Sequence, residues 1–234
     1  MRSNFLRGIS HGIPIALGYL SVSFGFGISA VRSGLSVFAA STISATNLTS
    51  AGQAAGIDII AAGGTILEMI LVQLTINIRY SLMALSLSQK LDKKFTTPHR
   101  LIASYGITDE IFAVCSAQPN MLVPSYMYGM IFIAAAGWIL GTFLGASAGQ
   151  ILPESVSSAM GIVLYGMFLA IIIPPAKKQK SVLCAVAIAA VLSLIFKYFL
   201  AFISSGFAII ICAVAASSVC ALLFPVEETE EAKQ

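Results

Sequence analysis

Charged residues are scarce in this sequence. Of its 234 residues, 10% are Asp, Glu, Lys or Arg, whereas 58% are hydrophobic. Soluble chains carry about 25% charged residues because their surfaces face water. The shortage excludes a soluble globular domain and places most of the surface against a lipid bilayer. The formal net charge of +3 is also too small to indicate binding to nucleic acid.

The residue patterns of enzymes and metal sites are missing too. The chain has no Walker A sequence, GxSxG elbow or HExxH helix, and no residue pair that suits an intramembrane protease. We therefore expect neither an enzyme nor an ATP-driven pump subunit. His11 and His99 are isolated, and the cysteines lie in apolar stretches without CxxC spacing, so no metal and no cofactor is expected. The four cysteines are Cys115, Cys184, Cys212 and Cys220.

Long apolar segments dominate the sequence instead. About 20 apolar residues cross a bilayer as a helix. This length predicts an all-α membrane protein, a polytopic helical bundle of about seven or eight membrane elements that could include a pseudo-two-fold repeat. We expect one transmembrane domain over residues 1–225 and a charged, disordered tail over 226–234. The expected spans are Gly12–Val31, Thr65–Leu87, Leu101–Gln118, Val123–Leu144, Val156–Ile173, Val182–Leu200 and Ser205–Phe224.

The stretch from Leu35 to Ala62 is too polar for a plain span and contains the sequence TNLTSAGQ. Short cytoplasmic segments carry an excess of Lys and Arg, so the N-terminus with Arg2 and Arg7 and the basic segment 90–100 should both be cytoplasmic. An even number of crossings must then separate them. We predict that residues 35–62 form a re-entrant pair of half-helices that bend at TNLTSAGQ and do not cross. The alternative is one long, kinked helix packed by small residues.

Transporters bind substrates at interrupted helices, because the free N–H and C=O groups at the break can meet a charged ligand. We therefore predict that Asn47, Thr49 and Gln53 contact substrate. The alternative is that Gln53 holds helices together without contacting a ligand. A weaker pattern is the recurrence of Ser50–Gln53 as Ser147–Gln150, which is compatible with an internal repeat.

Asn77 and Arg79 lie deep in the expected span 65–87. A charged residue there is costly unless it finds a partner or a cavity, so both residues are predicted to belong to the substrate site. The alternative is that the span ends earlier and Arg79 reaches the cytoplasmic surface. Asp58 and Glu68 flank a Gly-Gly turn and are expected at the membrane interface instead.

Asp109 and Glu110 precede a stretch from 111 to 153 without a charged residue. Adjacent residues on a helix point about 100° apart, so the two carboxylates should have different partners. One is predicted to form an ion pair with Arg79, and the other could carry a coupling proton. The alternative is a helix N-terminus near the membrane surface that Thr108 caps.

Three motifs in this order resemble the AzlC-type branched-chain amino acid permease family, the large subunits of two-component exporters. They are the Gly-Gln element 51–55, the Asn-x-Arg element 77–82 and the Thr-Asp-Glu-x-Phe element 108–112. The resemblance covers about residues 8–225. The chain departs from the family pattern in having Tyr80 where His is usual and a less aromatic segment around Gln53.

The resemblance implies a secondary transporter in the bacterial plasma (inner) membrane that exports valine, leucine and isoleucine. It also implies a separately encoded AzlD-type membrane subunit of about four spans. The residues are compatible with this function, because Arg79 could bind a substrate carboxylate while Asp109 or Glu110 binds its ammonium group or a proton. The alternative is a channel or a structural membrane subunit without alternating access.

Overall fold

The computed structural model describes residues 2–149 and 172–225, together with positions 151, 153, 155, 166 and 169. Most of the expected span at 156–173 and the expected tail at 226–234 therefore lie outside the described residues. The regular elements of the described part are helices, and one isolated bridge joins Leu91 to Leu122. The all-α architecture agrees with the prediction from composition.

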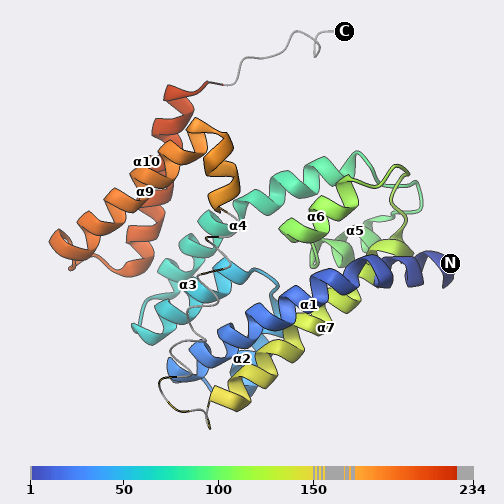
Figure 1. The fold of residues 1–234 in the computed structure, drawn as a ribbon, viewed down its shortest axis with the longest axis horizontal. Helices are drawn as coiled ribbons and strands as arrows, with labels where there is room; N and C mark the ends of the chain where they lie inside the picture. The colour runs from blue at the N-terminus through green and yellow to red at the C-terminus, as the bar shows by residue number, and fades with distance from the viewer. Residues whose placement is uncertain are drawn as a thin grey trace.

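Within the described residues, five helices are long and apolar enough to cross a membrane. Large apolar side chains are exposed on three of them, α4, α9 and α10, as at Leu74 and Phe199, which suits contact with lipid. The molecule is thus a polytopic helical membrane protein, with the helices arranged as in Figure 1. The five helices are α1 (Arg2–Arg32), α4 (Ile66–Ser88), α7 (Pro124–Gly149), α9 (Lys180–Phe199) and α10 (Ser205–Leu223).

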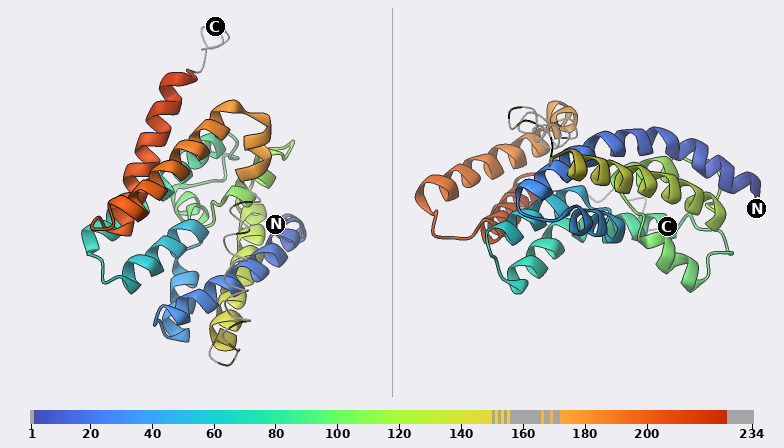
Figure 2. Two further views of the ribbon diagram at one scale, coloured as in Figure 1. Left: turned by 60° about the vertical axis from the view of Figure 1, so that its left-hand side comes forward. Right: turned by 90° about the horizontal axis from the view of Figure 1, so that it is seen from below.

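The most extensive helix pair joins α1 to α7, which lie side by side in Figures 1 and 2. Contacts advance in the same direction along both helices, because Gly137 faces Ala16 and Gly145 faces Phe24. The two helices are therefore parallel. A Cβ atom at either glycine would collide with the backbone of α1, so the absence of side chains permits this close approach.

The stretch 35–62 is a broken helix, as predicted. Helix α2 (Val37–Thr46) and helix α3 (Ser50–Ala61) are separated by the extended residues 47–49. Ten and twelve residues span about 15 and 18 Å, roughly half of a bilayer core. A continuous kinked helix is not what the chain forms.

The two half-helices turn back on themselves. Ala40 of α2 and Ile57 of α3 belong to one buried cluster with Ala146, near the C-terminal end of α7. Ser44 and Gln53, which lie nearer the break, contact α7 further from that end, at Thr142 and Trp138. The pair thus starts and finishes at the end of the molecule where α1 and α7 terminate (Figure 1). This hairpin arrangement is what a re-entrant segment requires.

The predicted span Leu101–Gln118 is wrong. The chain forms two short helices there, α5 (Thr97–Ser104) and α6 (Asp109–Ser116). Each has eight residues and covers about 12 Å, too little to cross a bilayer. Thr108 interrupts this apolar segment because it caps the N-terminus of α6. Its hydroxyl accepts a hydrogen bond from the amide of Ile111.

Helices α5 and α6 form a second broken pair, which enters from the opposite end of the molecule to α2 and α3. His99 on α5 contacts the hydroxyl of Tyr128, in the first turns of α7, and Lys90 donates to the carbonyl of Ser116 at the end of α6. Arg7 of α1 donates to Gln118 at the same end. The N-terminus and the basic segment 90–100 therefore lie together, as the predicted shared cytoplasmic location requires (Figure 1).

Helix α10 is attached to the rest of the molecule through Glu68. This side chain lies in the first turn of α4 and is 4% exposed because α10 covers it. Its carboxylate accepts hydrogen bonds from the Ser204 hydroxyl and the Gly206 amide, at the start of α10. Glu68 is therefore a buried residue that joins α4 to α10.

Candidate functional site

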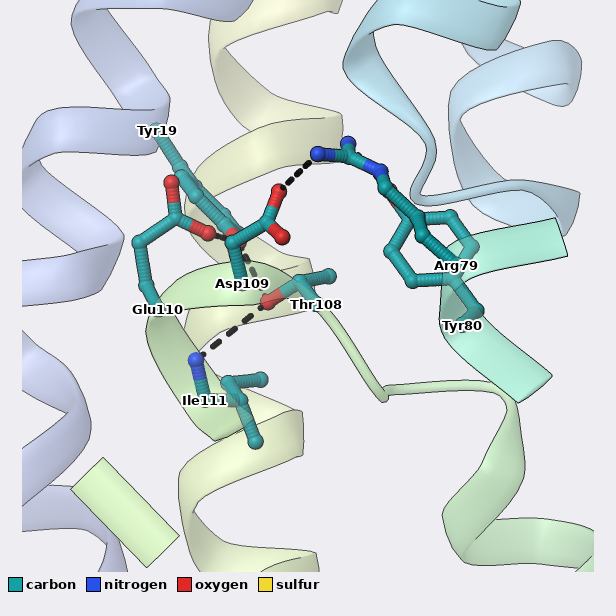
Figure 3. Close-up of polar contacts among 7 residues, drawn as sticks. All are labelled: Tyr19, Arg79, Tyr80, Thr108, Asp109, Glu110 and Ile111. Atoms are coloured by element: carbon teal, nitrogen blue, oxygen red, sulfur yellow. Dashed lines mark hydrogen bonds and ion pairs between the residues drawn. The ribbon is translucent and has the colours of Figure 1, made fainter. Parts of the chain in front are cut away.

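An ion pair joins α4 to α6 near the middle of the molecule. The guanidinium Nη1 of Arg79 lies 2.8 Å from the carboxylate Oδ2 of Asp109 (Figure 3). The side chains are 40% and 35% exposed, so the pair borders an open space. Arg79 is nine residues before the end of α4 at Ser88, about 14 Å away. It pairs inside the protein and does not reach the surface as the alternative proposed.

Tyr80 holds the guanidinium from a second side. Nη2 of Arg79 donates to the Tyr80 hydroxyl at 3.3 Å, and the guanidinium carbon lies 5.0 Å from the centre of the tyrosine ring. The ring face is electron-rich and attracts the cation. Arg79 is thus fixed at the wall of the open space, with its charge balanced by Asp109.

Glu110 has a different partner from Asp109, as the helix geometry predicted. Its Oε2 accepts a hydrogen bond of 2.6 Å from the hydroxyl of Tyr19 on α1, which also lies 2.6 Å from Thr108 Oγ1 (Figure 3). Thr108 caps α6 at the same time. The helix N-terminus that was expected as the alternative to an ion pair is therefore present together with the ion pair.

The structure does not place Gln53 where a substrate can reach it. The side chain is 2% exposed. Its Nε2 donates to the Asn47 carbonyl at 2.7 Å, and its Oε1 accepts from the indole N–H of Trp138 at 2.9 Å. The amide ties the break to α7, because the carbonyl groups left free by the broken helix need a donor. This arrangement matches the alternative, in which Gln53 holds helices together.

Asn47, Thr49 and Asn77 also brace the broken helix. The Asn47 side chain accepts from the backbone amide of Thr49 at 3.1 Å, which closes the turn. Asn77 donates to Gln73 at 3.0 Å, and Gln73 donates to the carbonyl of Gly52 at 2.8 Å. These contacts fix α3 against α4. Of the five predicted binding residues, only Arg79 lines the cavity described next.

A cavity of about 580 Å³ lies beside the ion pair. Its polar wall comes from three acids and one base, and the remaining wall is mainly apolar, as in sites for small organic ligands. Asp58, three residues before the end of α3 at Ala61, also belongs to this wall. The cavity is lined by Ser50, Ala51, Ala54, Ala55, Asp58, Ile76, Arg79, Asp109, Glu110, Ile172 and Ile209.

The N-terminus of α3 points at the same cavity. Ser50 and Ala51, in its first turn, line the wall. The side chain of Thr49, the preceding residue, makes no capping hydrogen bond. The first amides of a helix lack partners within the helix and carry a partial positive charge, which favours an anion. The cavity therefore presents two positive groups, Arg79 and the helix end, and three carboxylates.

Tyr19 and Trp138 were missed by the sequence reasoning. Their rings meet edge to face with centroids 5.2 Å apart. Tyr19 bonds Glu110 and Trp138 bonds Gln53, so this pair connects the acid at one break to the amide at the other. The available signal was a tyrosine hydroxyl and an indole N–H inside apolar spans, where each needs a partner.

Comparison with known proteins now places the chain. A family model described as AzlC protein matches residues 14–152, more than half of the chain. The chain belongs to the AzlC family. An AzlC relative in Escherichia coli strain K12, named "Inner membrane protein YgaZ", is 26% identical over 192 residues, which cover 79% of this chain and 78% of that protein.

Further relatives come from other organisms. An "Uncharacterized membrane protein" of Archaeoglobus fulgidus is 31% identical over 74% of this chain and 76% of its own length. Another protein with the same description, from Helicobacter pylori strain 26695, is 27% identical over 69% of this chain and 74% of its own length. No solved structure matches. The AzlC match contains both broken helices and the Arg79–Asp109 pair, so the chain is an AzlC membrane protein whose architecture is consistent with a transporter component.

Proposed function

We propose that this chain is a secondary transporter that exports valine, leucine and isoleucine across the bacterial plasma membrane. It works as the larger subunit beside a small AzlD-type partner of about four spans, and it is not an enzyme. Membership of the AzlC family supports the transporter class. The single observation that carries the substrate class is the Arg79–Asp109 pair at the wall of a largely apolar cavity.

The cavity has a group for each part of a branched-chain amino acid. The substrate carboxylate binds Arg79 and the free amides at the start of α3. Its ammonium group binds Asp109, or Asp58 in the same lining. The aliphatic side chain lies against the apolar wall, where Ile76 and Ile209 exclude water.

When an amino acid binds, Arg79 and Asp109 can exchange each other for the substrate's charged groups, so that no charge is left unpaired. In the structure Arg79 and Asp109 neutralise each other at 2.8 Å. A zwitterion offers one carboxylate to Arg79 and one ammonium to Asp109, so the pair can separate when substrate is present. Separation without substrate would leave two uncompensated charges within the membrane, which is unfavourable. The pair therefore favours a closed state until an amino acid enters.

Glu110 is the candidate for a coupling proton. It faces the cavity, but Tyr19 and not Arg79 is its bonded partner. Protonation of Glu110 would leave the Arg79–Asp109 ion pair intact, whereas protonation of Asp109 would break it. Proton coupling is accordingly assigned to Glu110 and substrate binding to Arg79 and Asp109.

One observation favours the channel alternative. The two broken helices come from opposite ends, and their tips meet beside the cavity, an arrangement that could also line a continuous pore. Counterflow in proteoliposomes that contain the chain and its small partner separates the two functions. A carrier accumulates external labelled leucine inside the liposomes in exchange for unlabelled leucine loaded there, whereas a channel does not.

The decisive variant is Arg79→Gln, with Lys180→Gln as the matched control at an exposed position on α9. We expect Arg79→Gln to lower leucine counterflow at least tenfold, because the carboxylate loses its cation, and Lys180→Gln to stay within twofold. Absence of counterflow in the wild-type complex would reject the carrier. Equal counterflow in Arg79→Gln would reject the site.

A further inference from the structure

A second pocket lies apart from the transport cavity, at the end of the molecule that carries the basic segment. Its volume is about 310 Å³, within the range of about 300–1,000 Å³ that is usual for ligand pockets. It is formed by the end of α4, by α5 and by α7, and it shares no lining residue with the cavity beside Arg79. We propose that this pocket binds an anionic glycerophospholipid of the adjoining leaflet.

The walls suit an acyl chain. Leu87, Phe95 and Met127 form the buried part of the lining and are 3%, 4% and 1% exposed. Helix α5 lies along the rim, with Ala103 buried and the apolar side chains of Leu101 and Ile102 exposed. Phe95 and Tyr128 hold His99 on two sides, which fixes the first turn of α5 next to α7.

The charge of the rim selects the headgroup. Arg100 is the only charged residue of the described lining, and its Nε donates to the Phe95 carbonyl at 3.4 Å. Among the described residues no acceptor binds its two terminal nitrogens, so both are available to a phosphate diester. Lys93 and Lys94 are exposed on the same segment. A basic rim over an apolar pocket at the end of a span is the arrangement that binds anionic headgroups.

Other ligands fit less well. An amino acid would leave its ammonium group without an anionic partner, because the described lining holds no acid. A free phosphate would leave the apolar wall uncovered. A lipid satisfies both parts, since its phosphate contacts Arg100 and one chain fills the pocket. This inference depends on the membrane location that the family shows and does not depend on the transported substrate.

The test uses the purified full chain in neutral detergent. Native mass spectrometry measures binding of dioleoylphosphatidylglycerol, dioleoylphosphatidylcholine and glycerophosphoglycerol, the headgroup without chains. We expect wild-type protein to bind phosphatidylglycerol at least fivefold more tightly than phosphatidylcholine. Arg100→Gln should weaken phosphatidylglycerol binding about tenfold, as expected for loss of one charge-assisted contact. Lys180→Gln, on α9 and outside the pocket, should remain within twofold.

A pocket-filling variant tests whether the acyl chain of the lipid occupies the pocket, independently of the headgroup charge. Ala84→Phe places a ring in the pocket and should reduce binding of both lipids, while thermal unfolding reports whether the variant is folded. Wild-type affinity for phosphatidylglycerol in Arg100→Gln would overturn the proposal. Equal affinity for the two lipids would overturn it as well. Competition by glycerophosphoglycerol as strong as that of the intact lipid would show a phosphate site and not a lipid site.

Discussion

The hydroxyl of Tyr105 donates a hydrogen bond of 2.7 Å to the carbonyl oxygen of Ala45. Tyr105 follows α5, and Ala45 lies at the end of α2, so this bond joins the tips of two broken helices that come from opposite ends of the molecule. The cavity residues Ser50 and Asp109 begin the second half of each pair. The substrate site that we propose is thus built where two helix N-termini meet.

Both broken pairs make a prediction about topology. Single cysteines at Ser33 and Ala62, which bracket the first pair, should react with a membrane-impermeant reagent from the outside only. Cysteines at Lys94 and Asn120, which bracket the second pair, should react from the cytoplasm only. The four native cysteines are replaced first. Reaction of Ser33 and Ala62 variants from opposite faces would mean that the first pair crosses the membrane.

The ion pair predicts non-additive effects on stability. Arg79→Ala leaves Asp109 without its cation and should cost about 1–3 kcal/mol, between the values for surface pairs and for fully buried pairs. The double variant Arg79→Ala with Asp109→Asn should be more stable than the sum of the two single losses implies. Thermal unfolding in detergent measures the cycle, with Lys180→Ala as a neutral control. Strict additivity would show that the pair contributes no coupling energy.

Gln53 is expected to affect folding more than ligand binding. Gln53→Ala leaves the Trp138 indole N–H and the Asn47 carbonyl without partners and should cost about 1–3 kcal/mol. Gln89→Ala, at an exposed position after α4, is the matched control and should change stability by less than about 0.5 kcal/mol. Leucine-dependent stabilisation should survive in both variants. Its selective loss in Gln53→Ala, with unchanged unfolding, would restore Gln53 to the binding site.

The spans and the first break were predictable because they depend on local sequence. A run of about 20 apolar residues is sufficient to indicate a span, and the small polar residues from Asn47 to Gln53 interrupt such a run. The second break was missed because residues 101–118 are nearly as apolar as a short span. Its signal was present in Thr108, Asp109 and Glu110, a helix start that we treated as an alternative to the ion pair.

The ion pair could be predicted, but the partners of Glu110 and Gln53 could not. Arg79 and Asp109 are complementary charges in an apolar setting, which leaves few other ways to neutralise either. Tyr19 is 91 residues from Glu110, and Trp138 is 85 residues from Gln53. Such contacts depend on the parallel packing of α1 and α7, which periodicity within one segment does not reveal.

The parallel packing of α1 and α7 makes its own prediction. An added Cβ atom at Gly141 would collide with the Ser23 side chain and the Leu20 backbone, whereas one at Gly18 meets nothing within 4 Å. Gly141→Ala should therefore destabilise the protein by about 1–3 kcal/mol, because a backbone contact cannot move aside. Gly18→Ala should be neutral or stabilising by up to about 1 kcal/mol, since alanine favours the helix. Unfolding by heat in the same detergent compares the two variants directly. The same unfolding temperature in both would mean that α1 and α7 are not packed through their glycines, and the position of Tyr19 and Trp138 beside Glu110 and Gln53 would then need another explanation.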